Sequence, residues 1–171
     1  MTTTVTSQNA SPLHGDARAG KYLTFQLGNE EFGIRVLKVR EIMGVQEITA
    51  VPRMPAHMKG VINLRGKVVP VIDLRLKFGL SAAEYTQRTC IVVTQVQGAA
   101  GAVLMGVVVD AVSEVLNLTA AEIEDTPDFG EEVSTDYLLG MAQSKGKVKI
   151  LLDIDKVLSS QELHNLNALL H

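Results

Sequence analysis

The chain of 171 residues contains no tryptophan and a single cysteine, and aromatic side chains make up only 4% of the sequence. One cysteine excludes both an internal disulfide and a zinc site built on several cysteines. Because aromatics are few while hydrophobic residues of all kinds reach 46%, the core must be aliphatic. This composition is typical of a globular protein with a substantial interior.

The chain also has no excess of positive charge, because 16 Lys and Arg against 19 Asp and Glu give a formal net charge of −3. Proteins that bind nucleic-acid phosphates need an excess of positive charge, and small barrels that bind single strands also use stacking aromatics. Composition therefore argues against nucleic acid as a partner, an alternative that salt-dependent retention on heparin would revive. No apolar run reaches the roughly 18 residues of a membrane helix, and the N-terminus lacks a signal-peptide pattern. We expect a cytoplasmic protein without direct membrane insertion.

Catalytic and metal-binding patterns are missing as well. His14, His57, His164 and His171 do not stand at metal-ligand spacing with one another, with the cysteine or with carboxylates. Cys90 lies in the apolar run T-C-I-V-V-T, where no neighbour in the sequence would activate it as a nucleophile. We therefore expect no enzymatic activity, no cofactor and no metal. The alternative, an enzyme or ligand-binding barrel, would show a bound metal or cofactor in native mass spectrometry.

The sequence does contain a series of short, strand-like apolar runs, which follow a tail over residues 1–20. The tail is rich in Thr, Ser, Gly and Ala, and we expect it to be disordered. Residues 22–27 and 30–36 form a hairpin pattern around a Gly-Asn turn. Residues 60–74 form a second hairpin pattern around the turn Arg65-Gly66.

Three further segments have weaker patterns. Residues 36–43 have room for one or two helical turns, and residues 45–51 are typical of another strand. A clear helical period is found only at the end of the chain, where Ser160 is placed to cap a helix over residues 159–171.

Two blocks of the sequence recur in the same order. Residues 32–43 match residues 105–116 after a shift of 73 positions, and residues 60–74 match residues 140–154 after a shift of 80. The matched positions are Gly33/Gly106, Ile34/Val107, Val36/Val109, Val39/Val112, Glu41/Glu114, Ile42/Val115, Gly60/Gly140, Arg65/Lys145, Gly66/Gly146, Lys67/Lys147 and Asp73/Asp153. Two such matches at nearly the same shift indicate an internal duplication.

The duplicated unit is interpreted as about five short strands that curl into a small barrel, since so few strands bury an apolar face best by closing. The fold class is then mainly all-β, with two five-stranded barrels, short helices and a C-terminal helix. The expected boundaries are about 21–84 for the first barrel and about 85–158 for the second. A groove between two such modules is a usual place for a ligand or partner.

Two kinds of polar residue allow both a structural and a functional interpretation. Asp73 and Asp153 each end an apolar run before a helix-like segment, and a helix N-cap is the preferred interpretation. Arg65 heads a turn, so its guanidinium is either solvated or paired with a carboxylate such as Glu41 or with a polar group on an incoming helix.

The four glycines that recur in the repeat also leave two alternatives open. Gly33, Gly60, Gly106 and Gly140 either avoid clashes where strands bend or border a contact surface that another chain approaches closely.

The strings E-E-F-G-I-R-V-L-K-V-R-E-I and V-P-R-M-P-A-H-M-K-G-V-I-N-L-R-G-K-V-V-P-V-I-D-L-R resemble the signature of the CheW family, the bacterial chemotaxis coupling proteins. The likeness continues through G-V-V-V-D-A-V-S-E-V-L and S-T-D-Y-L-L-G-M to K-I-L-L-D-I-D-K-V-L, and spans about residues 20–160. Its most specific part is the string N-L-R-G-x-x-x-P-V-I-D-L-R.

The resemblance implies a non-enzymatic scaffold made of two SH3-like five-stranded barrels. Its partners would be the regulatory domain of the histidine kinase CheA, which shares the double-barrel fold, and the cytoplasmic tip of methyl-accepting chemoreceptors. The receptor's helical hairpin would lie between the barrels. Further copies of the chain would join the kinase in rings beneath membrane-associated receptor arrays.

The resemblance also assigns residues to two partner surfaces. The receptor-facing positions would be Val39, Glu41, Gly60, Asn63, Leu64, Arg65, Gly66, Cys90, Gly106, Val115 and Gly140. The kinase-facing surface would include Ile34, Arg35 and Val36, with loops at the barrel ends. Two positions depart from the family pattern, namely Arg35, where an acidic residue is frequent, and His57, where an aromatic is more usual.

Overall fold

The structure is a computed structural model that describes residues 17–98, 101–127 and 135–170. Most of the predicted tail, residues 1–16, lies outside the described residues. The elements in chain order are β1 (Gly20–Leu27), β2 (Glu30–Arg35), η2 (Val36–Lys38), β3 (Val39–Gly44), β4 (Met58–Leu64), β5 (Lys67–Asp73), α2 (Leu74–Lys77), β6 (Cys90–Gly98), β7 (Gly101–Val109), β8 (Ala111–Leu118), η3 (Ala120–Glu122), β9 (Ile123–Glu124), β10 (Leu138–Ser144), β11 (Lys147–Leu152), α3 (Ile154–Val157) and α4 (Ser160–Leu170). No helix among these residues is long and apolar enough to span a membrane.

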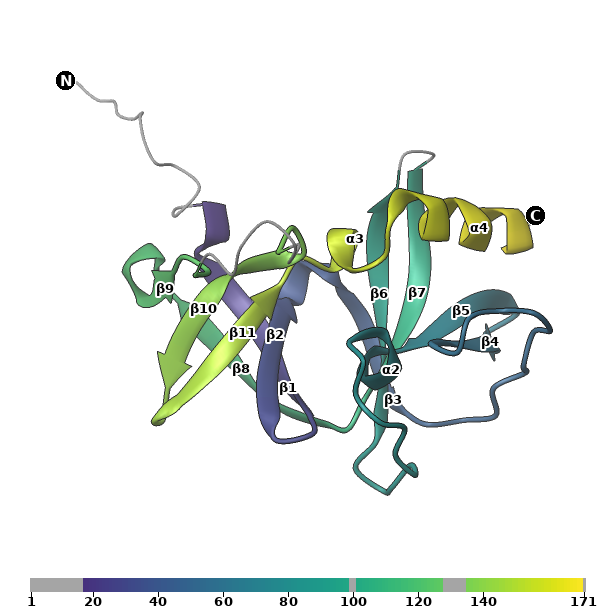
Figure 1. The fold of residues 1–171 in the computed structure, drawn as a ribbon, viewed down its shortest axis with the longest axis horizontal. Helices are drawn as coiled ribbons and strands as arrows, with labels where there is room; N and C mark the ends of the chain where they lie inside the picture. Colours follow the sequence, from purple (N-terminus) through teal and green to yellow (C-terminus); the bar gives the residue numbers. More distant parts are fainter. Residues whose placement is uncertain (1–16, 99–100, 128–134, 171) are drawn as a thin grey trace.

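The molecule is mainly β, and its strands form two mixed sheets that lie side by side (Figure 1). The first sheet has six strands in the order β8-β1-β2-β11-β10-β9, and the second has five in the order β3-β6-β7-β5-β4. The first sheet exceeds the predicted five strands because the two-residue strand β9 is added at one edge.

The predicted division of the chain at residues 84 and 85 is wrong for the sheets. The hairpin β1–β2 belongs to the first sheet, whose other strands all follow residue 110, whereas the hairpin β6–β7 belongs to the second sheet with β3, β4 and β5. The two repeats thus exchange their first hairpins. Parallel strand pairing joins each exchanged hairpin to its sheet. Val71 on β5 pairs with Gly106 on β7 in the second sheet, and Leu151 on β11 pairs with Gly33 on β2 at the equivalent positions of the first.

Two segments differ from their predicted secondary structure. Residues 36–43 form only the short turn η2 before continuing as strand β3, in which half-buried and exposed residues alternate. This run contains several β-branched residues, and pairing with β6 favours the extended form over a helix. Residues 45–51 form no strand, and only Thr49 makes an isolated bridge, to Val61.

Asp73 and Asp153 are helix N-caps, as preferred from the sequence. Each carboxylate accepts a hydrogen bond from the backbone N–H two residues later, at 2.9 Å for Asp73 and 3.1 Å for Asp153. Their own backbone N–H groups donate to the carbonyls of His57 and Tyr137, each at 2.8 Å. The two halves therefore repeat the same local hydrogen bonds, which supports the internal duplication.

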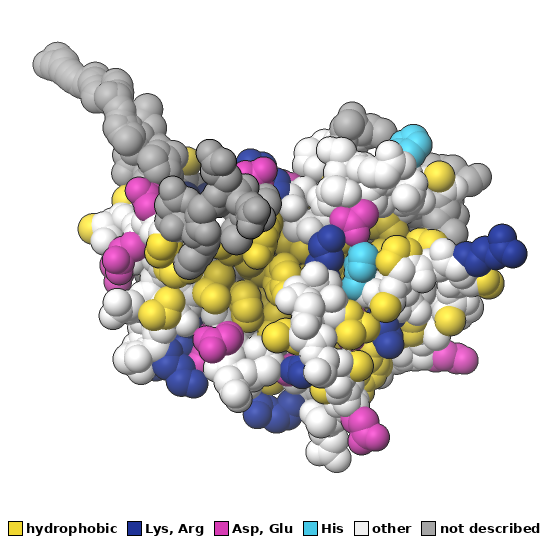
Figure 2. All heavy atoms as spheres, in the orientation of Figure 1, with side chains coloured by type: hydrophobic (Ala, Val, Ile, Leu, Met, Phe, Trp, Pro, Cys, Tyr) yellow, Lys and Arg dark blue, Asp and Glu magenta, His cyan; other side chains and the backbone are white. Residues whose placement is uncertain are grey.

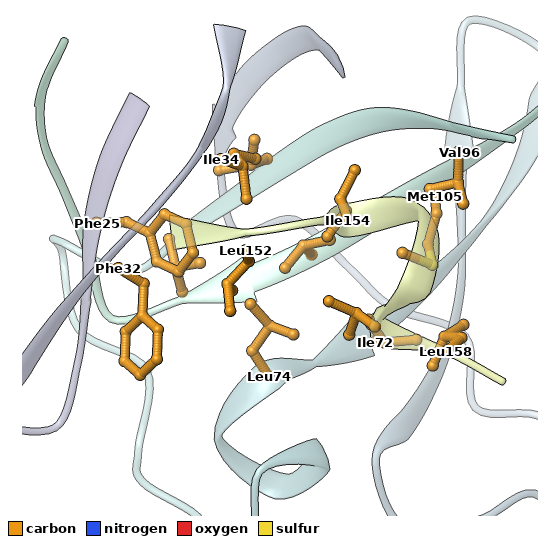
Figure 3. Packing of buried hydrophobic residues seen from close by; sticks show 14 of the residues in the cluster. Phe25, Phe32, Ile34, Ile72, Leu74, Val96, Met105, Leu152, Ile154 and Leu158 are labelled. Carbon is orange, nitrogen blue, oxygen red and sulfur yellow. The ribbon is translucent and has the colours of Figure 1, made fainter. Parts of the chain in front are cut away.

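The largest apolar cluster lies between the sheets rather than within either of them. The side chains come from both sheets and from α3, and converge on the seam as Figure 3 shows for Ile34, Leu152, Ile72, Met105 and Ile154. Each sheet also encloses a smaller cluster, around Tyr22 and Leu151 in the first and around Ile91 and Val71 in the second. The expected groove between the modules is therefore filled along most of the seam by a common core.

One charged pair lies inside the first sheet. Lys149 Nζ is 2.8 Å from Glu31 Oε1, and the two side chains are only 3% and 12% exposed. The repeat shifts place Val69 and Leu104 at the equivalent positions of the second sheet, where both belong to its apolar cluster. The same interior position is thus occupied by an ion pair in one sheet and by aliphatic side chains in the other.

We predict that Lys149→Met destabilises the fold by about 3 kcal/mol, because it leaves the Glu31 carboxylate buried without its partner. The double variant Glu31→Leu/Lys149→Val, which copies the second sheet, is expected to recover most of this loss. Urea denaturation followed by circular dichroism measures both changes. A double variant as unstable as the single one would contradict this account.

Helix α4 is capped by Ser159, not by Ser160 as the sequence suggested. Glu162 N donates to Ser159 Oγ at 3.1 Å, and Ser159 N donates to Glu162 Oε1 at 2.9 Å. These reciprocal hydrogen bonds form a capping box, for which the serine must stand one position before the first helical residue.

Glu162 also attaches α4 to the rest of the fold. Lys77 Nζ donates to Glu162 Oε1 at 2.9 Å, and His57 Nε2 lies 2.8 Å from Glu162 Oε2. Burial disfavours the charged carboxylate, but the Ser159 amide and Lys77 outweigh this effect and lower the pKa of Glu162 to about 2. The ionised carboxylate therefore joins α4 to α2 and to the loop that carries His57.

Because the pKa of Glu162 is lowered from 4.5 to about 2, its contribution to stability is present in full above pH 4.5 and is lost as the pH falls toward 2. We expect Glu162→Gln to lower the melting temperature at neutral pH and to lower it progressively less in acid. Thermal melts of both proteins across this range test the prediction, which fails if the difference stays constant with pH.

Candidate functional site

The end of the second sheet carries the arginine that stands out in the sequence. Arg65 Nη2 donates to Glu41 Oε1 at 2.6 Å, and Arg65 Nη1 donates to Oε2 at 3.3 Å. The planar guanidinium thus forms a bidentate contact with the carboxylate. Of the alternatives left open by the sequence, the pairing of Arg65 with Glu41 is the one present. The Arg65 side chain nevertheless remains 73% exposed, so a partner can reach it.

A tight turn sets the position of this arginine. Arg65 and Gly66 have φ angles of 51° and 87°, which suit a two-residue hairpin turn, and Asn63 Oδ1 accepts a hydrogen bond from Gly66 N at 2.8 Å. The hydrogen bond from Arg65 lowers the pKa of Glu41 below its usual 4.5, so the pair is fully charged at neutral pH.

A pocket of about 490 Å³ lies beside this ion pair. It is lined by Arg40, Glu41, Leu64, Arg65, Lys67, Val93, Gln95, Ala102, Val103 and Leu104. The lining combines three cations, one carboxylate and several aliphatic side chains, which suits a protein surface with both polar and apolar groups better than a small reactive substrate.

The first sheet carries an equivalent ion pair that the sequence analysis did not predict. Lys145 Nζ lies 2.9 Å from Glu114 Oε1, and the Lys145 side chain is 72% exposed. The repeat already aligned these two residues with Arg65 and Glu41, so the signal was present. The hairpins β4–β5 and β10–β11, whose turns carry Arg65 and Lys145, lie at opposite ends of the molecule (Figure 1).

The remaining receptor-facing positions do not form one continuous surface with Arg65. Val39 and Cys90 are half-buried and pack against the core between the sheets. Val115 is 54% exposed, but it lies on β8 in the first sheet. The structure therefore brings together Glu41, the turn of residues 63–66 and the pocket beside them. Val39 shares β3 with Glu41, and Gly60 shares β4 with Asn63. Cys90, Gly106, Val115 and Gly140 lie on other strands.

The four repeated glycines are buried, and three of them are in tight contact with backbone or core atoms. A Cβ added at Gly60 would lie 2.0 Å from Thr49 O, and one added at Gly140 would lie 2.6 Å from Glu124 O. A Cβ at Gly106 would lie 2.9 Å from an Ile91 methyl group. Close packing inside the fold, rather than approach by another chain, accounts for these glycines.

The kinase-facing positions differ in their exposure. Ile34 is only 1% exposed and belongs to the core between the sheets, so its side chain is not available to a partner. Arg35 lies over the Tyr22 ring at 5.8 Å and donates to a backbone carbonyl, and Val36 packs against the common core. The sequence analysis missed Leu37, which is 81% exposed beside them in η2. The sequence allowed one or two helical turns over residues 36–43, but nothing in the pattern indicated which apolar side chain the turn would expose.

No metal-binding cluster of three or more His, Cys, Asp or Glu side chains occurs among the described residues. His57 Nε2 lies 2.8 Å from Glu162 Oε2, and Cys90 Sγ lies 3.3 Å from the Arg88 carbonyl oxygen. The described surface carries exposed ion pairs at the ends of the two sheets and exposed apolar side chains.

Known proteins resemble this chain over nearly its whole length. The CheW-like domain family matches residues 21–162. The chemotaxis protein CheW of Klebsiella aerogenes is 43% identical over 90% of this chain and 90% of its own length, and that of Rhizobium meliloti is 36% identical over 82% and 88%. The crystal structure of the scaffolding protein TtCheW from Thermoanaerobacter tengcongensis matches with a TM-score of 0.72 and 29% identity, covering 83% of this chain and 95% of that one.

The packing around the glycines can be tested by adding a single methyl group. We predict that Gly60→Ala destabilises the fold by about 3 kcal/mol, because the new Cβ overlaps a carbonyl and the residue has a strained φ. Gly44→Ala is the matched control, since nothing lies within 4 Å of a Cβ at Gly44. Urea denaturation compares the two variants. Equal stability of both, with partner binding lost only in Gly60→Ala, would instead make Gly60 part of a contact surface.

Proposed function

The chain belongs to the CheW family, and from this premise we propose how its surfaces serve two partners. Members of the family are non-enzymatic adaptors, and this protein couples chemoreceptors to the histidine kinase CheA. The observation that carries this function is the 43% identity to a chemotaxis protein CheW across 90% of both chains. The proposal concerns which residues do the coupling and how.

We propose that coupling here is a matter of position, with no bond made or broken. Each sheet serves as an SH3-like barrel, and the core between them holds their outer ends at a fixed separation. One partner is the regulatory domain of the kinase and the other is the cytoplasmic tip of a methyl-accepting receptor, with further copies of the chain in rings. The protein then works in the cytoplasm, where membrane-associated receptor arrays recruit it. Individually weak contacts gain strength when many are linked in this way.

The receptor-facing surface is proposed to centre on Arg65. Its guanidinium is oriented by Glu41 and by the rigid turn, so little side-chain entropy is lost when a partner binds. The pocket beside it adds apolar area from Leu64 and Leu104. Val39, Cys90, Gly60 and Gly106 are then proposed to support this surface through packing rather than through direct contact. Val115 and Gly140 belong to the first sheet, where Val115 is exposed and provides a separate proposed contact.

The kinase-facing surface is proposed to lie around η2. Arg35 and Val36 keep the roles assigned by the resemblance, whereas Ile34 supports them from the core. Leu37 is the most exposed large apolar side chain of the described residues, with 81% of its surface accessible, and it provides the apolar anchor that such a contact needs.

The receptor-facing surface can be tested by reversing one charge. Arg65→Glu places a carboxylate opposite Glu41 and removes the guanidinium, so we expect affinity for a receptor-tip fragment to fall at least about tenfold. The free energy of unfolding is expected to change by less than about 1 kcal/mol, because exposed ion pairs contribute little to stability. Fluorescence anisotropy measures the affinity, and urea denaturation measures the stability.

Lys145→Glu is the matched control, since it reverses the equivalent charge at the other end of the molecule with nearly the same exposure, 72% against 73%. It is expected to leave receptor binding within about twofold of the unaltered protein, an effect no larger than that of exposed charges in general. Equal loss of binding in both variants, or in neither, would refute the assignment to Arg65.

A further inference from the structure

Helix α4 covers a groove at one end of the seam between the sheets. Leu163 and Leu166 point into the common core, so that the helix presents two leucines at a spacing of three. Leu163 lies against the β6–β7 hairpin, where a Cβ at Gly98 would be 3.9 Å from Leu163 Cδ1. Leu166 lines a pocket with His57 and Met58. The helix thus extends from the tip of the β6–β7 hairpin to the segment before β4.

The internal duplication creates the same groove a second time. Its wall begins at Leu27–Glu30, the tip of the β1–β2 hairpin, which is the counterpart of the β6–β7 tip. It ends at Tyr137 and Leu138, the counterparts of His57 and Met58 after the shift of 80. Phe78 in this groove corresponds to Leu158 beneath α4.

No described element covers this second groove, which forms a pocket of about 620 Å³. Its floor is a row of stacked rings, with centroids 5.8 Å apart for Phe32 and Phe78 and 5.5 Å apart for Phe78 and Tyr137. Leu80, which is 39% exposed, and Ile150 extend the apolar lining. On the face that Figure 2 shows, hydrophobic side chains gather near the middle, between the two sheets.

The charges around the two grooves differ in one informative way. In the open groove the charge of Arg75 is neutralised by Asp110, whose Oδ2 accepts a hydrogen bond from Arg75 Nη1 at 2.7 Å. Glu30, by contrast, lies on the rim of the groove with its side chain exposed. The shift of 73 places Val103 at the position of Glu30 in the covered groove, where it lines a pocket with His164 of α4. A helix seated in the open groove would therefore carry its residue equivalent to His164 near Glu30.

We propose that the open groove is a docking site for an amphipathic helix of a partner protein, seated as α4 is seated in the equivalent groove. The helix presents two aliphatic side chains at a spacing of three to the aromatic floor, and a basic residue directly after the first of them pairs with Glu30. This site contains none of the residues proposed for the receptor or the kinase surface, and the inference does not rest on those assignments.

The probe is a labelled peptide with the sequence of residues 159–170 and the substitution His164→Arg, which keeps the capping box and adds the basic group. Fluorescence anisotropy follows its binding to the full chain. Leu80→Glu places a carboxylate in the lining without touching the core, and we expect it to weaken binding at least about tenfold. Val68→Glu, at an exposed apolar position on β5 in the second sheet (56% exposed), is the control and is expected to change affinity less than about twofold.

The charge prediction gives a second readout from the same titrations. Glu30→Lys is expected to weaken binding of the His164→Arg peptide about threefold and to favour a peptide with His164→Glu instead. Three results would overturn the proposal: affinity that is indifferent to Leu80→Glu, binding that appears only after residues 1–16 are removed, or a dimer in sedimentation that Leu80→Glu dissociates. The last two would assign the groove to the chain's own N-terminus or to a second copy.

Discussion

The apolar core shared by the two sheets is the constraint on which the other features depend. Ile34 and Leu152 enter it from the first sheet, and Ile72 and Met105 enter it from the second. Each sheet therefore buries apolar side chains against the other sheet. The exchange of hairpins strengthens this dependence, because each repeat supplies two strands to the sheet of the other. Neither half of the chain contains a complete sheet of its own.

Duplication gives the fold two copies of each local device, and the copies have diverged in chemistry while keeping their geometry. A turn with positive φ carries Arg65 at one end and Lys145 at the other, each paired with a glutamate. The guanidinium can hold a carboxylate with both arms, whereas the ammonium acts as a single point charge. The interior shows the same kind of divergence, because Lys149 occupies the position that Val69 fills in the other sheet. The backbone is thus conserved within the molecule, and the side chains distinguish its two ends.

The sequence contains enough information for the local elements and for the duplication, but not for the connections between them. Hairpins around Arg65-Gly66 could be predicted because turn residues and alternating apolar residues act over a few positions. The pairing of Arg65 with Glu41 could be anticipated as one alternative. The exchange of hairpins could not, since the strands of a duplicated unit pair equally well within or between repeats as far as pattern is concerned. The burial of individual side chains was the feature that the sequence predicted least well. Ile34 and Leu37 are both apolar, but Ile34 lies in the core while Leu37 is exposed, because the turn η2 changes the direction of the chain between them.

An adaptor without catalytic chemistry transmits only relative position, and this explains why the core must be shared. If the sheets moved independently, a partner bound at one end would leave the other end free to reorient. Each further binding event would then lose free energy to the entropy of fixing that end. A contact of micromolar strength corresponds to about −8 kcal/mol, and flexibility within the scaffold would consume a large part of it. The common core removes that loss in advance. The helix α4 then breaks the internal symmetry, since it fills one of two equivalent grooves and makes the two halves of the molecule different.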